Sequence, residues 1–141
     1  MKYLKTYKLF ENIEVSRDLG YQSTFSDEFF NTIKDICLEL SDKDYEVHIH
    51  ECEYHKESPT RLASGPIYKS ISIDVDYPDN ETFISVLLSI QDFCKENGFD
   101  VDVEIPKEDE FLSVDDFIDY ASDGGNFSKL SIIIYQPLPQ Q

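Results

Sequence analysis

Apolar and polar residues alternate strictly in three segments of the chain, at residues 45–54, 67–77 and 99–105. A period of two places successive side chains on opposite faces of a β-strand, so each segment predicts a strand with one covered and one solvated face. A fourth segment, residues 127–135, contains the continuous apolar run Ile132-Ile133-Ile134. Such a run indicates a strand that is buried on both faces or central in its sheet.

Helical spacing of apolar residues predicts two long helices between these strands. The first begins at Ser26, which is a good N-cap, and ends near residue 40; the second is opened by Pro78-Asp79 and ends at Asn97, followed by Gly98 as a C-cap. A short helix with Ser113 as its N-cap is expected before the last strand, and another over residues 1–12. Residues 13–25 show no clear period and are interpreted as a linker.

The order of these elements, αββαββ, predicts an α+β fold. The simplest arrangement is a two-layer sandwich, in which a four-stranded sheet carries the two main helices on one face. This order resembles a circular permutation of the ferredoxin-like fold, which carries no function by itself. We expect a single domain over residues 1–141: an N-terminal helix and linker (1–25) and an α+β body (26–141) with an acidic insertion at 107–125.

Negative charge is concentrated in one part of the sequence. The formal net charge is −17, from 29 acidic and 12 basic residues, and residues 74–123 alone hold sixteen acidic residues against two lysines. A concentrated negative field repels nucleic acid and anionic membrane and attracts basic partners. We therefore expect a basic protein partner and no direct binding to nucleic acid or membrane.

The remaining composition suggests a folded cytoplasmic domain. Hydrophobic residues make up 40% of the chain and include ten Phe and nine Tyr, which is too apolar for a disordered acidic tail. The sequence shows no apolar run of membrane-spanning length and no signal-peptide pattern. The three cysteines are widely spaced, which favours reduced thiols.

The solvated face of the predicted sheet is acidic and rich in hydroxyl groups. One interpretation is a face that keeps the domain in solution; the other is an interaction surface whose carboxylates imitate a nucleic-acid backbone. The second interpretation favours a non-enzymatic protein that binds a basic, nucleic-acid-binding partner. Its candidate residues lie on two strands and in the insertion: Asp74, Asp76, Asp100, Asp102, Glu104, Glu108, Asp109, Glu110, Asp115, Asp116 and Asp119.

An alternative function comes from the segment HIHECEYH at residues 48–55. His48, His50 and Cys52 share one face of the predicted strand, and His55 follows it. Imidazole and thiolate are ligands that zinc and copper prefer, so a metal-binding protein or metalloenzyme is an open alternative. A ligand turn such as CxxC, usual in structural zinc sites, is missing from the sequence.

Other chemistry finds little support in the sequence. Paired carboxylates are abundant, but no pair is distinguished from the others as a general acid and base. The phosphate-binding patterns GxxxxGK[ST] and GxGxxG are absent. We expect no enzymatic activity and no cofactor, and a structural or assembly component is a further alternative.

The opening MKYLKTYKLFEN resembles the N-termini of small uncharacterised proteins of large tailed bacteriophages. These often begin with Met-Lys, two residues, Lys, an aromatic residue and then Phe-Glu. The resemblance covers about twelve residues and implies an origin, not an activity. It would make the chain a phage accessory or anti-defence factor that acts in the host cytoplasm.

Overall fold

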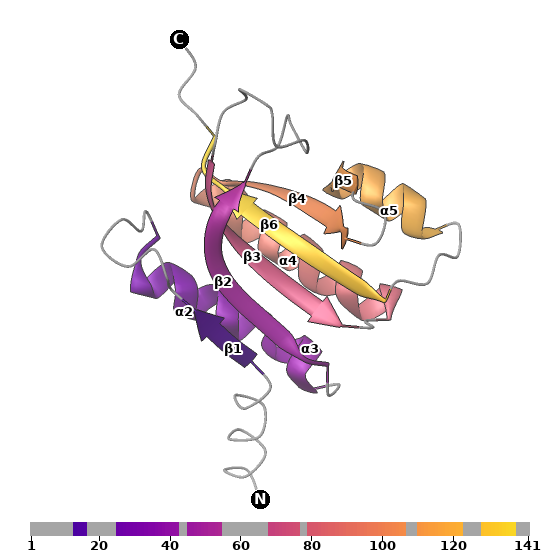
Figure 1. The fold of residues 1–141 in the computed structure, drawn as a ribbon, viewed down its shortest axis with the longest axis horizontal. Helices are drawn as coiled ribbons and strands as arrows, with labels where there is room; N and C mark the ends of the chain where they lie inside the picture. Colours follow the sequence, from indigo (N-terminus) through magenta and orange to yellow (C-terminus); the bar gives the residue numbers. More distant parts are fainter. Residues whose placement is uncertain are drawn as a thin grey trace, which may run out of the picture.

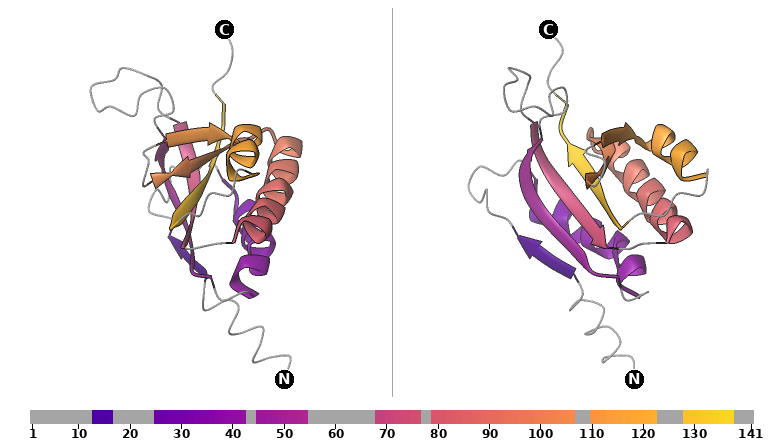
Figure 2. Two further views of the ribbon diagram at one scale, coloured as in Figure 1. Left: turned by 90° about the vertical axis from the view of Figure 1, so that its right-hand side faces the viewer. Right: turned by 45° about the vertical axis from the view of Figure 1, so that its right-hand side comes forward.

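The computed structural model describes residues 13–16, 25–42, 45–54, 68–76, 79–106, 110–122 and 128–137. Within these residues, six strands form one sheet and the helices lie together on one side of it (Figure 1; Figure 2). The predicted helix at 1–12 and the segment HIHECEYH beyond Tyr54 lie outside the described residues. The elements are β1 (Ile13–Ser16), α2 (Asp27–Ile36), α3 (Leu38–Asp42), β2 (Val47–Tyr54), β3 (Tyr68–Asp76), α4 (Asn80–Glu96), β4 (Asp100–Ile105), β5 (Glu110–Ser113), α5 (Val114–Ser122) and β6 (Lys129–Tyr135).

The strand order is β1-β2-β3-β6-β4-β5. β1 is parallel to β2, whereas every other neighbouring pair is antiparallel. The four strands expected from the sequence lie next to one another in the order β2-β3-β6-β4, with β3 and β6 inside, as in a circularly permuted ferredoxin-like sheet. β6 is flanked by strands on both sides, which agrees with its continuous apolar run.

The α+β fold is confirmed, but the sheet has two more strands than predicted. β1 lies in the segment that we interpreted as a linker, and β5 lies in the acidic insertion. Each has only four residues, too few for a period to be recognised. They become strands because they pair with β2 and β4, which is a tertiary effect that local pattern does not encode.

The helix boundaries follow the capping residues in the sequence. The Ser26 side chain accepts a hydrogen bond from the Phe29 amide at 3.0 Å, and the Asp79 side chain accepts one from the Thr82 amide at 2.8 Å. α4 ends at Glu96, and Gly98 then adopts a positive φ of 81° that turns the chain into β4. An L-residue with a Cβ is strained at such a φ, whereas glycine is not.

The main core lies between the helices and one face of the sheet. Ile49, Ile73, Ile132 and Val103 point from the four inner strands into this layer, and all are at most 1% exposed. Phe83 of α4 and Phe117 of α5 meet there with ring centroids 5.5 Å apart. Burial of one such aromatic side chain is worth about 1.5–3 kcal/mol. The opposite face of the sheet, called the open face below, carries the candidate functional residues.

Candidate functional site on the open face

Strand pairing brings the polar residues of the open face together in rows across the sheet. His50 of β2 lies opposite Ser72 of β3, and Asp74 of β3 lies between His48 of β2 and Ser131 of β6. As predicted from the alternation, these side chains are on the face away from the helices. The rows continue onto β4, where Glu104 is opposite Ser131.

Asp74 is the centre of a hydrogen-bond network in these rows. Its Oδ1 accepts hydrogen bonds from the hydroxyl groups of Ser72 at 2.8 Å and Ser131 at 2.7 Å. Its Oδ2 lies 3.0 Å from Nε2 of His50. Burial raises the pKa of Asp74, but the hydrogen bonds from Ser131, Ser72 and His50 outweigh it and the pKa is below its ordinary value. The carboxylate is therefore held charged and oriented.

The polar groups of this network do not form an activated nucleophile. Cys52 contacts Ser70, with Sγ 3.2 Å from the Ser70 hydroxyl, and burial raises the pKa of its thiol above the ordinary value. A thiol with a raised pKa is protonated near neutral pH and is a poor nucleophile. His50 is oriented by Asp74, as in acid–base sites, but its strand neighbour Cys52 is not activated by it.

Three of the four candidate metal ligands lie in the described part of the chain. His48, His50 and Cys52 share the open face as expected, while His55 lies outside the described residues. Among the residues that the structure describes, no group of three or more His, Cys, Asp or Glu side chains could hold a metal ion. In that part of the chain, two of the three candidate ligands are engaged by Asp74 and Ser70 instead.

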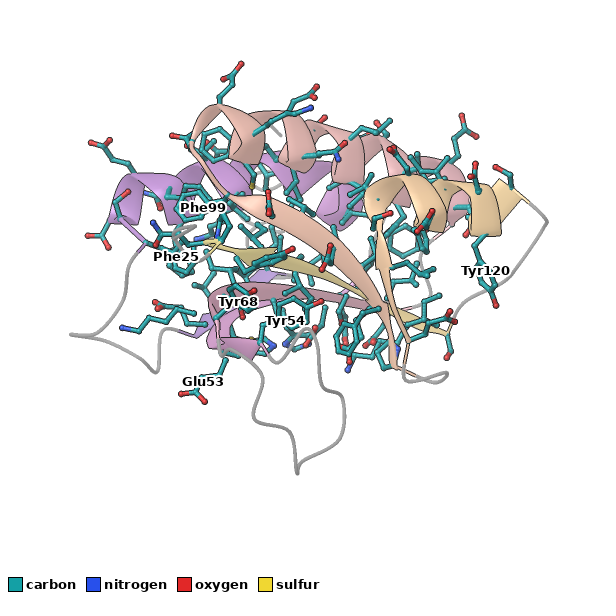
Figure 3. The ribbon with its side chains drawn as sticks, turned by 90° about the horizontal axis from the view of Figure 1, so that it is seen from above. Phe25, Glu53, Tyr54, Tyr68, Phe99 and Tyr120 are labelled. Carbon is teal, nitrogen blue, oxygen red and sulfur yellow. The ribbon has the colours of Figure 1, made fainter. Side chains whose placement is uncertain are left out.

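An aromatic cluster covers one end of the open face, where β2 and β6 end and β3 begins. Tyr54, Tyr135 and Ile133 are buried there, with Tyr68 and Phe111 packed against them. The ring of Tyr54 lies 5.1 Å from that of Tyr135 and 5.2 Å from that of Phe111. Figure 3 shows Tyr54 and Tyr68 on the side of the sheet away from the helices.

The aromatic cluster changes the interpretation of Asp102. We expected Asp102 on a solvated face, but it is only 7% exposed and its Oδ2 accepts a 2.8 Å hydrogen bond from the Tyr54 hydroxyl. Asp102 therefore belongs to a second small core and not to the solvated part of this face. Ser70, Ser72 and Ser131 are buried on this face as well.

The exposed carboxylates lie mainly at the β4–β5–α5 end of the sheet. Asp74 is half-buried in its network, and Asp76 lies opposite Lys129 in the pairing of β3 with β6. Glu108 and Asp109 lie outside the described residues. The remaining candidates are exposed or half-exposed and form what we call the acidic rim: Asp100, Glu104, Glu110, Asp115, Asp116 and Asp119.

Three of the residues that sequence reasoning missed are tyrosines. Tyr54, Tyr68 and Tyr135 lie at the ends of their strands. Because side chains an even number of residues apart share a face, these tyrosines lie on the same face as Cys52 and Ser70. At the neighbouring ends of three strands, a tyrosine lies an even number of residues from the polar residues of the open face. This pattern is the signal that could have revealed the second core. Ser131 was missed because it interrupts an otherwise apolar strand.

Comparison with known proteins adds no assignment. No protein-family model, curated protein or solved structure matches the chain. The helices in the described part of the chain are too short or too polar to cross a membrane.

Proposed function

We propose that this chain is a non-enzymatic acidic protein that binds a basic protein partner through the acidic rim. The observation that carries the proposal is the exposure of these carboxylates on elements whose own sequences contain no basic residue. β4, β5 and α5 contain seven acidic residues and no lysine or arginine. Unbalanced charge of this kind accelerates encounter with a cationic surface and selects against anionic partners.

The structure also supports a rigid platform for the rim. β4 is held by β6 and β5, and α5 packs on α4 through Phe117 and Phe83. Side chains on a fixed backbone bind without the entropic cost of ordering a segment. The proposed partner is of the kind that binds nucleic acid, for which an array of carboxylates takes the place of phosphates.

The resemblance of the N-terminal residues to phage proteins supports a biological setting for this proposal. In that setting the chain is a phage accessory or anti-defence factor that occupies a basic host protein in the host cytoplasm. The proposal competes with a structural or assembly role, which would also use an exposed charged surface. The two differ in the partner, because an assembly component binds copies of particle proteins.

The test is capture of partners from a host lysate with matched charge variants. The rim variant Glu110→Gln/Asp116→Asn/Asp119→Asn removes three exposed charges from the acidic rim. The control Glu39→Gln/Glu46→Gln/Glu53→Gln removes the same charge from exposed positions on α3, before β2 and on β2. We expect a basic protein to bind wild type and control and to be lost from the rim variant. We also expect it to dissociate as the salt concentration is raised above the physiological value, at which the screening length is roughly 8 Å. Equal capture by all three proteins would refute the proposal.

A further inference from the structure

A hollow of about 240 Å³ opens at the start of β4, beside the last turn of α4. It exists because β5 pairs with β4 only from Asp102 to Ile105, so that no described strand covers Asp100 and Val101 on that side. The volume is below the roughly 300–1,000 Å³ of pockets that hold drug-sized ligands. It is the size of a site for one long side chain.

Two aromatic residues line the hollow and are fixed by their own packing. Phe99 stacks within 4.8 Å of Phe29 and 5.2 Å of Phe25, between the sheet and α2 (Figure 3). Tyr135 is 2% exposed and its ring lies 5.0 Å from that of Tyr68. The two residues reach the hollow from the helix side and from the open face, so its walls do not need to be ordered by a ligand.

Three charged side chains and one amide complete the lining. Asp100 and Asp102 come from β4, and Lys95 and Gln91 come from α4. Asp100 is exposed and, within the described residues, its carboxylate has neither a hydrogen bond nor an ion pair. Asp102 is held in place by Tyr54. Two carboxylates against one ammonium give the hollow a net negative charge.

We propose that this hollow binds an arginine side chain of the basic partner. A guanidinium group stacks on an aromatic ring and donates hydrogen bonds to carboxylates along its planar edge, and the hollow offers the ring of Phe99 and the carboxylates of Asp100 and Asp102. Lys95 and Gln91 in its lining can donate hydrogen bonds to the main-chain carbonyl groups that accompany an arginine in a peptide. A lysine ammonium makes the same charge contact but lacks the planar group that stacks and bonds in two directions, so the hollow selects arginine over lysine.

This inference rests on the proposed function for the source of the arginine, but its test does not. The probe is Nα-acetyl-arginine amide, titrated into the ¹⁵N-labelled protein and followed by chemical-shift changes. Nα-acetyl-citrulline amide has nearly the same shape without the charge, and Nα-acetyl-lysine amide has the charge without the plane. We expect saturable shifts for arginine at residues 91–102 and 135, weaker ones for lysine and none for citrulline.

Single charge variants provide the control. Asp100→Asn is expected to weaken binding of the arginine probe about tenfold, since it removes a charge-assisted contact. Asp35→Asn removes the same charge from an exposed position on α2, outside both the hollow and the acidic rim, and is expected to change binding less than about twofold. Lys95→Gln, which removes the competing positive charge, is expected to strengthen binding.

The outcomes separate this inference from the proposed function. Shifts spread over the acidic rim, equal effects of Asp100→Asn and Asp35→Asn, equal affinity for lysine and arginine, or no saturable shifts would each overturn the arginine site. If the arginine site fails while the rim variant still loses its captured partner, the proposed function stands without it. If the probe binds as expected while no basic partner is captured, the site stands and the proposed function fails.

Discussion

The hydroxyl group of Tyr54 on β2 donates a 2.8 Å hydrogen bond to Oδ2 of Asp102 on β4, although β3 and β6 lie between these two strands. Burial raises the pKa of the Tyr54 hydroxyl, and the hydrogen bond to Asp102 raises it further. The Tyr54 hydroxyl group therefore keeps its proton at neutral pH. The bond fixes an aromatic side chain across the open face and provides a partner for a buried carboxylate.

Tyr54→Phe is expected to destabilise the protein by about 1–3 kcal/mol, because it takes a hydrogen-bond donor from a buried carboxylate. The matched control is Tyr68→Phe, since Tyr68 belongs to the same cluster and its hydroxyl bonds to no described residue. Urea unfolding of both variants measures the difference. Equal loss of stability in the two would show that the Tyr54 hydroxyl contributes through something other than Asp102.

Asp74→Asn is expected to destabilise the protein at neutral pH by about 1–3 kcal/mol, because the hub of three hydrogen bonds loses its charge. The folded pKa of Asp74 lies below the ordinary value of 3.8, so the folded state binds fewer protons than the unfolded state. Its stabilisation is then present above the unfolded pKa and is lost as pH falls through the folded pKa.

We therefore expect the stability advantage of wild type over Asp74→Asn to shrink as the pH is lowered from about 5 to 2. Urea unfolding at several pH values measures this difference. The exposed substitution Asp116→Asn is the control and should cost less than about 0.5 kcal/mol at neutral pH. An advantage of wild type that grows on acidification would contradict the network described for Asp74.

The three cysteines are expected to react at very different rates in the folded protein. Burial raises the pKa of Cys37 and of Cys94 to about 12, whereas Cys52 is only partly buried and its pKa is raised to a lesser extent. Since the thiolate is the reactive form, iodoacetamide at pH 8 should modify Cys52 slowly and the other two only after unfolding. Peptide mass spectrometry after timed labelling identifies the order. Rapid labelling of Cys37 or Cys94 would show that the core opens.

Zinc binding distinguishes the alternative function from the proposed one. We expect protein purified without a histidine tag to contain well under one equivalent of zinc, because Asp74 and Ser70 engage His50 and Cys52. Elemental analysis of wild type and of His48→Ala/Cys52→Ala measures this. One equivalent in wild type that is lost in the variant would favour the metal-binding alternative.

Local sequence predicted the elements that carry their own period, and it failed where pairing or distant contacts decide. The N-cap at Ser26, the start of a helix at Pro78-Asp79 and the strands β2, β3 and β4 were predicted correctly. β1 and β5 are strands only because β2 and β4 offer edges to them. The burial of Asp102 depends on Tyr54, which is 48 residues away in sequence, so no local pattern distinguishes it from the exposed Asp100.

The position of β6 affects when the sheet can assemble during synthesis of the chain. β6 joins β3 to β4 in the sheet, yet it follows both in sequence. While the chain emerges from the ribosome, the unit formed by β1, β2 and β3 and the unit formed by β4 and β5 each have an unpaired edge and no strand in common. An exposed edge of this kind can pair with other chains. The sheet closes only when residues 129–135 insert between the two units, so we expect assembly of the domain to be delayed until synthesis of this strand is complete.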